Sequence, residues 1–174
     1  QGTFYIDPDE MRLYVWSDYG RDVFQESVKV EASARSIIWK NNGNYIQMHG
    51  IIFRYAANTF WQGGVQIFGN HNVIEDCTIE KMSAPGATFK GDNLTLRETV
   101  IQDNGQIGFW AGGAHYLHIT DSIIRNNNTK GFALGFEAGG NKILHSRGVI
   151  FENRKFVNKH GDGMGFGYSR EEGE

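Results

Sequence analysis

Three acidic residues in the second half of the chain can supply acid–base chemistry. Glu137 stands between glycine-containing turns in the longest spacer of an internal repeat, with Asp103 before it and Asp162 after it. Glycoside hydrolysis usually needs two carboxylates about 5 to 10 Å apart. One hypothesis is therefore that Glu137 is a general acid or nucleophile and that Asp103 or Asp162 is its partner. The alternative is that Glu137 accepts backbone N–H bonds from the glycine turn that follows it.

Lys130 and Asp162 form a second candidate pair, because each directly precedes a glycine that we align at the same place of the repeat. If the repeats stack as coils, the two side chains lie about 5 Å apart. A lysine beside a carboxylate can act in acid–base chemistry on a sugar, whereas the ordinary alternative is a surface ion pair that adds little stability. Glu137, Asp162 and Lys130 are the predicted catalytic residues.

Trp110 is the main candidate for substrate binding. It stands two places after a repeat glycine, where a strand residue is expected to point outward, and the residues that we align with it on the following coils are Ala133 and Gly165. A solvent-facing indole offers a flat apolar surface on which a sugar ring can stack, while packing under a neighbouring loop is the alternative. The other predicted substrate-binding residues are Asp103, Asn128 and His160.

Composition and charge exclude several classes of protein. The 174 residues are 40% hydrophobic and carry 20 acidic and 17 basic side chains, a formal charge of -3, so no broad cationic surface is available for nucleic acid. The single cysteine, Cys77, excludes an internal disulfide framework. No apolar run approaches the ~20 residues of a membrane span, so no membrane partner is expected. The 23 glycines and 2 prolines indicate many tight turns.

An internal repeat organises the chain. Each copy has two apolar anchors separated by an acidic and a small residue, and the copies diverge toward both ends. The first anchors stand at positions 48, 74, 96, 119 and 151. A glycine follows seven residues after the second anchor in four copies, at Gly86, Gly108, Gly131 and Gly163. The clearest copies are Ile74-Glu75-Asp76-Cys77-Thr78-Ile79, Leu96-Arg97-Glu98-Thr99-Val100-Ile101 and Ile119-Thr120-Asp121-Ser122-Ile123-Ile124.

Most of these spacings, at 22 to 26 residues, predict a right-handed parallel β-helix of about five coils, because stacked coils bury one continuous core. The apolar anchors should form core ladders, and the acidic residues between them should lie at a bend and face solvent. Residues 3–16 predict a β-hairpin that caps the N-terminal end. We assign residues 1–29 to this cap, 30–167 to the β-helix and 168–174 to a polar tail. Since the tail cannot cover the last coil, we expect further coils or an oligomer there.

Four stretches resemble a known group of proteins. Residues 2–7, 12–15 and 45–53 are similar to the beginning of bacterial secreted right-handed β-helix proteins of the pectate-lyase-like superfamily, which are carbohydrate-active enzymes. Residues 126–142 also resemble this group and are the most distinctive block. The resemblance implies a polysaccharide or oligosaccharide substrate and a secreted or periplasmic location. It departs after Gly163, where group members continue through a tryptophan and acidic residues and this chain has Met164 to Gly167.

The resemblance leaves three functions open: a glycoside hydrolase, a uronate lyase or epimerase, and a non-catalytic carbohydrate-binding or structural solenoid, possibly a fragment of a longer enzyme. Lyases of this fold use a cation, often calcium, and a basic residue that removes a proton. Lysines and arginines that can serve are Lys130, Lys142, Arg125 and Arg147. No carboxylate cluster has calcium-ligand spacing and the histidines have no zinc-site spacing, so we expect no cofactor unless the protein is a lyase with calcium.

Overall fold

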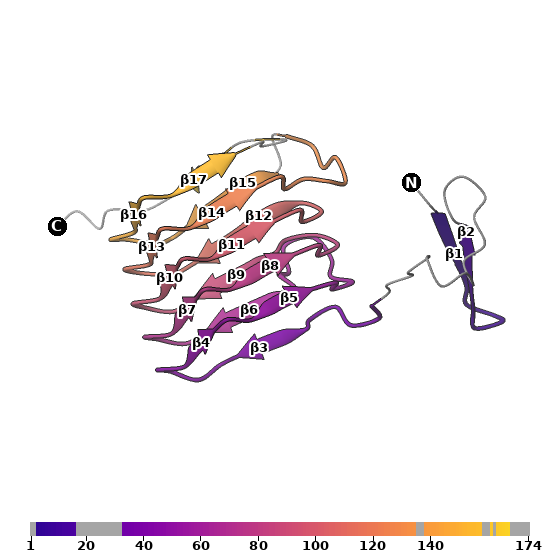
Figure 1. Ribbon diagram of the computed structural model, residues 1–174, viewed down its shortest axis with the longest axis horizontal. Helices are drawn as coiled ribbons and strands as arrows, with labels where there is room; N and C mark the ends of the chain where they lie inside the picture. The colour runs from indigo at the N-terminus through magenta and orange to yellow at the C-terminus, as the bar shows by residue number, and fades with distance from the viewer. Residues whose placement is uncertain (1–2, 17–32, 135–137, 158–160, 162, 168–174) are drawn as a thin grey trace. The chain divides into compact units, whose positions relative to one another are not determined.

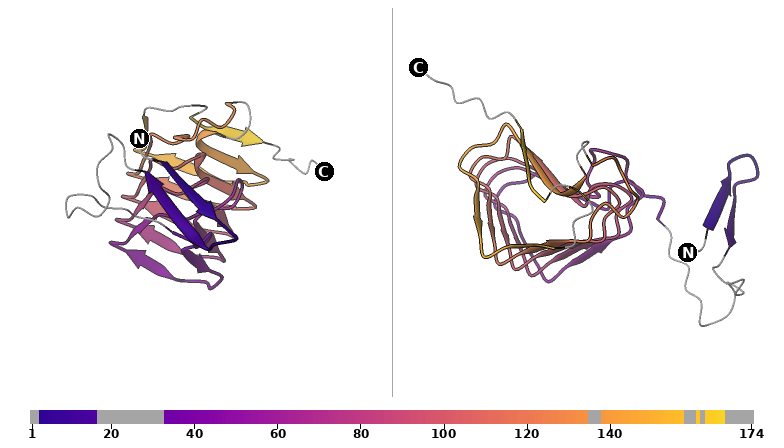
Figure 2. Two further views of the ribbon diagram at one scale, coloured as in Figure 1. Left: turned by 90° about the vertical axis from the view of Figure 1, so that its right-hand side faces the viewer. Right: turned by 90° about the horizontal axis from the view of Figure 1, so that it is seen from above.

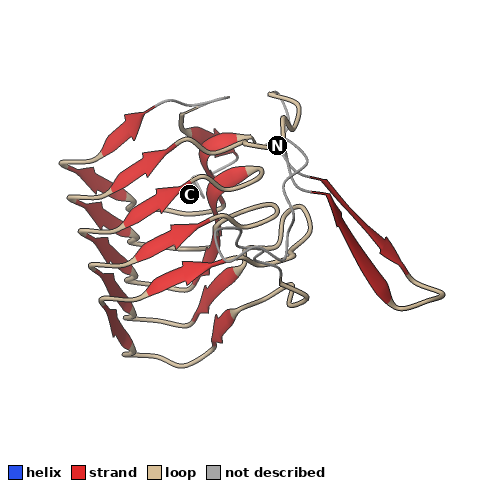
Figure 3. Ribbon diagram, turned by 45° about the vertical axis from the view of Figure 1, so that its right-hand side comes forward, coloured by secondary structure: helices blue, strands red, loops and turns tan. Residues whose placement is uncertain are grey.

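The computed structural model describes residues 3–16, 33–134, 138–157, 161 and 163–167, and it divides into two units, Gln1–Ala32 and Ser33–Glu174. Every regular element in these residues is a β-strand, so the predicted all-β class is confirmed (Figure 3). The first unit contains the predicted hairpin, in which β1 (Thr3–Asp7) pairs antiparallel with β2 (Arg12–Trp16). Its role as a cap of the β-helix stays a prediction.

The second unit is a parallel β-solenoid of about five coils, as predicted, and its strands form three parallel sheets (Figure 1). Sheet I consists of β4 (Gln47–His49), β7 (Val73–Glu75), β10 (Thr95–Arg97), β13 (His118–Thr120) and β16 (Ile150–Glu152). Sheet II consists of β5 (Ile52–Arg54), β8 (Thr78–Glu80), β11 (Val100–Gln102), β14 (Ile123–Arg125) and β17 (Lys155–Val157). Sheet III consists of β3 (Trp39–Asn41), β6 (Val65–Phe68), β9 (Ala87–Lys90), β12 (Ile107–Gly112), β15 (Gly139–Leu144) and β18 (Gly165–Gly167).

The core ladders predicted from the anchors are confirmed. In sheet I, Leu96 pairs with Ile74 on one side and with Ile119 on the other, and all three are buried. Ile101 of sheet II lies in the same way between its two neighbours in the stack. The three sheets enclose these ladders, and the view along the stack shows the coils superimposed around one interior (Figure 2). Each coil therefore buries its apolar side only because a neighbour covers it.

The bend between sheets I and II also agrees with the sequence. Asp76, Glu98 and Asp121 are exposed and have φ of 49° each, so the acidic column lies at a left-handed bend and faces solvent. The small residues that follow are buried and form a second column. In it the backbone N–H of Cys77 donates to Thr99 Oγ1 at 3.3 Å, and the N–H of Thr99 donates to a serine hydroxyl one coil further on at 3.2 Å. Side chains thus satisfy backbone donors that the bend leaves without a strand partner.

One alignment of the repeat was wrong. We aligned Gly131 with the glycine that precedes each strand of sheet III, but in that coil the strand is β15, which begins eight residues later at Gly139. The pairing of Phe109 with Asn141 fixes this register. The seven-residue rule failed because this coil carries its insertion before the strand. Gly140 therefore takes the place that we assigned to Gly131. Glycine is required there because a Cβ would collide with the carbonyl of Gly163 on the next coil.

Candidate functional site

Two long loops leave the solenoid at the same edge, between sheets II and III (Figure 1). Loop A (residues 55–64) joins β5 to β6 in the first coil, and loop B (residues 126–138) joins β14 to β15 in the fourth. The two coils between them have shorter turns at the same edge, residues 81–86 and 103–106. Loops on a regular scaffold are where binding residues are expected, so this edge is the candidate site.

Loop A is clamped at both ends onto the second coil. The Asn58 amide donates to the Pro85 carbonyl at 2.8 Å and accepts from the Ala84 N–H at 3.2 Å. At the other end, the N–H of Gly63 donates to Thr88 Oγ1 at 2.9 Å. A Cβ on Gly63 would collide with the backbone of the Thr88 strand, so glycine is required for this approach. The loop covers the outward Thr88, which is 5% exposed.

Loop B is anchored at its start by Asn128. The side chain of this asparagine accepts a hydrogen bond from the Phe132 N–H at 2.7 Å and donates to the Phe132 carbonyl at 3.0 Å. The backbone N–H groups of Thr129 and Lys130 donate to Asn104 and Gly105 on the coil below at 3.1 Å each. Asn128 is buried, so it holds the loop's shape, and its predicted contact with substrate stays a prediction.

An open hollow of about 730 Å³ lies between loop B and the coil beneath it. Its polar and apolar lining residues are Asp103, Asn126, Asn128, Thr129, Gly131, Phe132, Ala133 and Leu134. Asp103 and Asn128, two of the predicted substrate-binding residues, thus lie at the same hollow. The Asp103 carboxylate has no hydrogen bond or ion pair with any described residue, and its side chain is only partly exposed.

Lys130 reaches from loop B across one coil. Its Nζ donates to Ser83 Oγ at 3.2 Å. Lys130 does not take the place that we assigned to it before the sheet III strand, because it lies in loop B and Gly139 is the residue that pairs with Ile107. The other member of the predicted column, Asp162, lies outside the described residues. The lysine instead lies where the turns of two coils and loop B meet.

Trp110 points outward from β12, as predicted, between the buried inward residues Phe109 and Ala111. Its ring lies across Gly112, where a Cβ would collide with the indole, and its exposure is intermediate. The expectation of a small neighbour on the next coil is wrong. The corrected register pairs Trp110 with Lys142, not Ala133, and Ala133 instead lines the hollow.

Three predicted site residues, Glu137, Asp162 and His160, lie outside the described residues. Sequence reasoning also missed residues at this edge. Phe132, which directly follows the misaligned Gly131, is a partly exposed wall of the hollow. Phe60 and Trp61 lie in loop A, outside the repeat pattern. Two adjacent aromatic residues in an inserted loop were the signal that could have identified them.

A ladder of buried asparagines supports the hollow from inside the solenoid. Asn104 Oδ1 accepts from the Met82 N–H at 3.1 Å, and the Asn104 side chain donates to Asn127 Oδ1 at 2.9 Å. Asn127 Oδ1 also accepts from the backbone N–H of Asn104 at 3.1 Å. Because Asn104 and Asn127 directly follow Asp103 and Asn126, this ladder fixes the backbone that presents the lining side chains.

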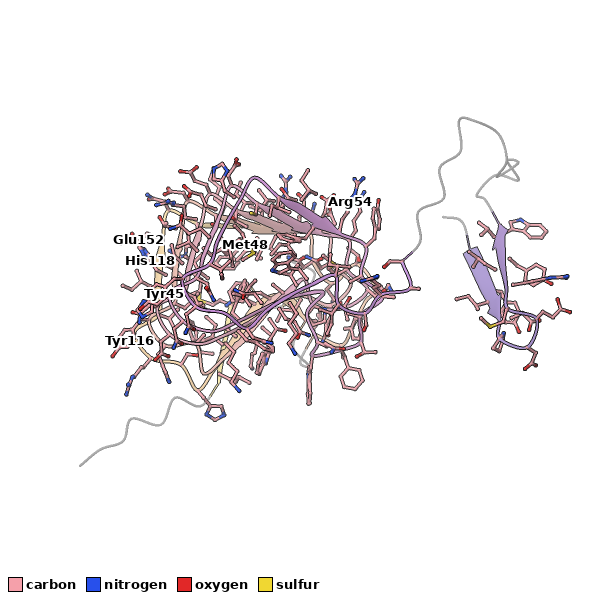
Figure 4. The ribbon with its side chains drawn as sticks, turned by 90° about the horizontal axis from the view of Figure 1, so that it is seen from below. Tyr45, Met48, Arg54, Tyr116, His118 and Glu152 are labelled. Atoms are coloured by element: carbon pink, nitrogen blue, oxygen red, sulfur yellow. The ribbon has the colours of Figure 1, made fainter. Side chains whose placement is uncertain are left out.

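Ion pairs cross the outer face of sheet I. Arg97 Nε donates to Glu75 Oε1 at 2.7 Å, and this hydrogen bond, with the charge of the guanidinium, lowers the pKa of the Glu75 carboxyl. The same bond raises the pKa of Arg97. On the same face His118 Nε2 and Glu152 Oε2 lie within hydrogen-bond distance, 3.0 Å apart. Figure 4 shows His118 and Glu152 on the side of the solenoid away from Arg54, which immediately precedes loop A.

Two kinds of feature are absent from the described residues. In that part of the chain no group of three or more His, Cys, Asp or Glu side chains is placed to hold a metal ion. No helix long and apolar enough to cross a membrane occurs in it either.

Comparison with known proteins gives one match. The family model described as "Right handed beta helix region" matches residues 35–172. No curated protein and no solved structure matches the chain.

Proposed function

The chain belongs to the right-handed β-helix family, and from this premise we propose that it binds a saccharide chain at the edge formed by loops A and B. The observation that carries the proposal is the Asp103 carboxylate, which is without a partner among the described residues and lines the hollow of loop B. A carboxylate accepts hydrogen bonds from vicinal hydroxyl groups, and an adjacent ring packs against the C–H face of a sugar.

The other lining residues support a sugar as the ligand. Asn126 offers an amide, which both donates and accepts hydrogen bonds, and the Thr129 hydroxyl, which donates to the Asn104 carbonyl at 3.3 Å, can still accept one. Phe132 adds an apolar surface beside them. A few polar groups around an aromatic wall, in a hollow open to solvent, suit a long polymer that enters sideways better than an enclosed small molecule.

Hydrolysis of the bound saccharide is the second candidate function, and the Asp103 carboxylate, which has no partner among the described residues, favours it over a uronate lyase. Hydrolysis needs a second carboxylate, and Glu137 follows the lining residue Leu134 by three positions in the sequence. We propose Asp103 and Glu137 as the pair. Lys130, one of the four basic residues that could serve a lyase, has its Nζ hydrogen-bonded to Ser83.

The binding proposal is tested by calorimetric titration with a panel of neutral and uronic oligosaccharides. Asp103→Asn should lower the affinity about tenfold or more, because a charged acceptor is lost. Asp121→Asn is the matched control, since this aspartate has a similar positive φ but lies at the bend between sheets I and II. Equal affinities of wild type and Asp103→Asn would contradict the proposal.

The reaction is tested with the same panel by product analysis. New reducing ends without an ultraviolet-absorbing product indicate hydrolysis, and Glu137→Gln should then abolish them. Unsaturated products indicate the lyase alternative. Binding without products supports the carbohydrate-binding function and rules out both enzyme hypotheses for the saccharides tested.

A further inference from the structure

Two aromatic side chains at the tip of loop A stand outside the solenoid core. Phe60 is 59% exposed and Trp61 is 52% exposed, and their rings meet edge to face with centroids 5.7 Å apart. Large apolar side chains at an exposed loop tip commonly mark a contact site. Both side chains present apolar surface to solvent.

The backbone conformation at residue 61 does not favour a tryptophan. Its φ is 63°, and it is the third residue of a turn in which the Gln62 N–H donates to the Thr59 carbonyl at 3.3 Å. Glycine or asparagine suits that position, whereas a bulky residue is strained there. Other positive-φ bends recur at equivalent places in successive coils, but Trp61 belongs to an insertion. Strain kept at an exposed residue is a feature of functional sites.

The tip is held in place before any ligand arrives. Asn58 and Gly63 fasten the two ends of loop A to the second coil through hydrogen bonds to Pro85 and Thr88. A ligand that stacks on the tip therefore loses little affinity to the ordering of the loop.

The tip and the hollow belong to one surface. Loop A bonds to Ala84 and Pro85, and Lys130 of loop B bonds to Ser83, so the two loops meet at the same short turn. Their roots are three coils apart, which is about 14 Å at the usual strand spacing. An oligosaccharide of several units can bridge such a distance, whereas a single sugar cannot.

We propose that Phe60 and Trp61 form a second sugar-binding subsite, on which a ring of the saccharide chain held by the loop B hollow stacks. The inference rests on the proposed function and extends it. It assigns an extended oligosaccharide or polysaccharide, rather than a single sugar unit, as the ligand.

The test is a length series. Cello-, xylo- and galacturono-oligosaccharides of about one to six units, which bracket the span of ~14 Å set by the strand spacing, are titrated into the whole chain by calorimetry. In the wild type, affinity should rise with length and then level off. Trp61→Asn and Phe60→Ala should lower the affinity of the longest binding saccharide about tenfold, to that of its shorter homologues, and leave short-chain binding unchanged.

Two comparisons make the result decisive. Asparagine suits the φ of residue 61, and urea unfolding of Trp61→Asn beside wild type separates lost binding from lost folding. Tyr116→Ala removes an exposed aromatic residue of similar φ from another edge and should leave the length dependence unchanged. If both loop A variants keep the wild-type dependence of affinity on saccharide length, this inference is contradicted and the proposed function is not. No binding at any length contradicts the proposed function and the inference together.

Discussion

The buried hydroxyl of Thr99 is a residue on which the stacking of coils depends. It accepts the N–H of Cys77 from the coil below and donates to the Arg97 carbonyl at 2.9 Å. Thr99→Val keeps the shape but leaves these groups unpaired, so it should lower the free energy of unfolding by about 1–3 kcal/mol. Urea denaturation measures this loss.

Thr78→Val is the matched control for Thr99→Val. Thr78 lies on the outer face of β8, where no described residue hydrogen-bonds to its hydroxyl, and a change within about 0.5 kcal/mol is expected. Equal losses for the two variants would show that the hydroxyl ladder does not stabilise the bend.

The pair of Glu75 and Arg97 predicts a pH dependence. The hydrogen bond from Arg97 lowers the pKa of Glu75 below its usual 4.5. A lowered folded-state pKa means that the pair stabilises the fold above the unfolded-state pKa, and that this contribution is lost as the pH falls through the lowered value. The difference in urea midpoint between wild type and Glu75→Gln should therefore be present near neutral pH and disappear in acid.

Asp92→Asn is the comparison for that experiment, because the Asp92 carboxylate has no hydrogen bond with a described residue. Its midpoint should differ little from wild type across the same range. A Glu75→Gln difference that persists unchanged into acid would mean that the charge of Glu75 is not what stabilises the pair. The effect is small in either case, since both side chains are partly solvated.

Single residues were predictable where the repeat fixes their place. Asp76, Glu98 and Asp121 face solvent as expected because their column follows directly from the anchors. The charge of Asp103 made it a candidate. Its position beside Asn128 at the hollow depends on the shape of loop B, which lies outside the repeat and could not be predicted from it.

At the scale of elements, loop A depends on one close contact. Gly63→Ala introduces a Cβ that collides with the backbone of Ala87 and Thr88, so the loop should lift from β9. We expect faster hydrogen exchange in residues 56–63 and a loss of long-chain affinity like that of Trp61→Asn. Exchange measured by mass spectrometry, with saccharide titration alongside, checks both.

Thr88→Val tests the same contact as Gly63→Ala with a smaller structural change. It removes the hydroxyl that receives the Gly63 N–H and adds no collision, so its effect on loop A should have the same direction and a smaller size. Unchanged exchange in loop A for both variants would contradict the account of how the loop is clamped.

Strands of sheets I and II were predictable from the sequence and one strand of sheet III was not. The anchors recur at nearly constant spacing, so register follows from alternation and burial. In the fourth coil the insertion of loop B places the strand, β15, later in the sequence than the spacing predicts. Gly131 stands at the expected spacing but belongs to a turn of loop B. Glycines occur in both turns and strand starts, so their positions alone could not distinguish the two.

At the scale of the whole molecule, stability should decline toward the ends of the solenoid. β7, β8 and β9 have a strand on each side, whereas β16, β17 and β18 are paired on one side only within the described residues. A coil with one neighbour buries less surface, and opening begins there. Amide exchange should be slowest in the second to fourth coils and faster in the last. Uniform exchange along the stack would contradict this expectation.

The central claim is that a saccharide chain binds along the edge formed by loops A and B. Amide exchange with and without the tightest-binding oligosaccharide tests it most directly. Protection should appear in residues 56–63, 81–86, 103–106 and 126–134 and be absent from the bend between sheets I and II, and Asp103→Asn should weaken it. Protection confined to that bend or to the ends of the solenoid, or none at saturating saccharide, would contradict the account.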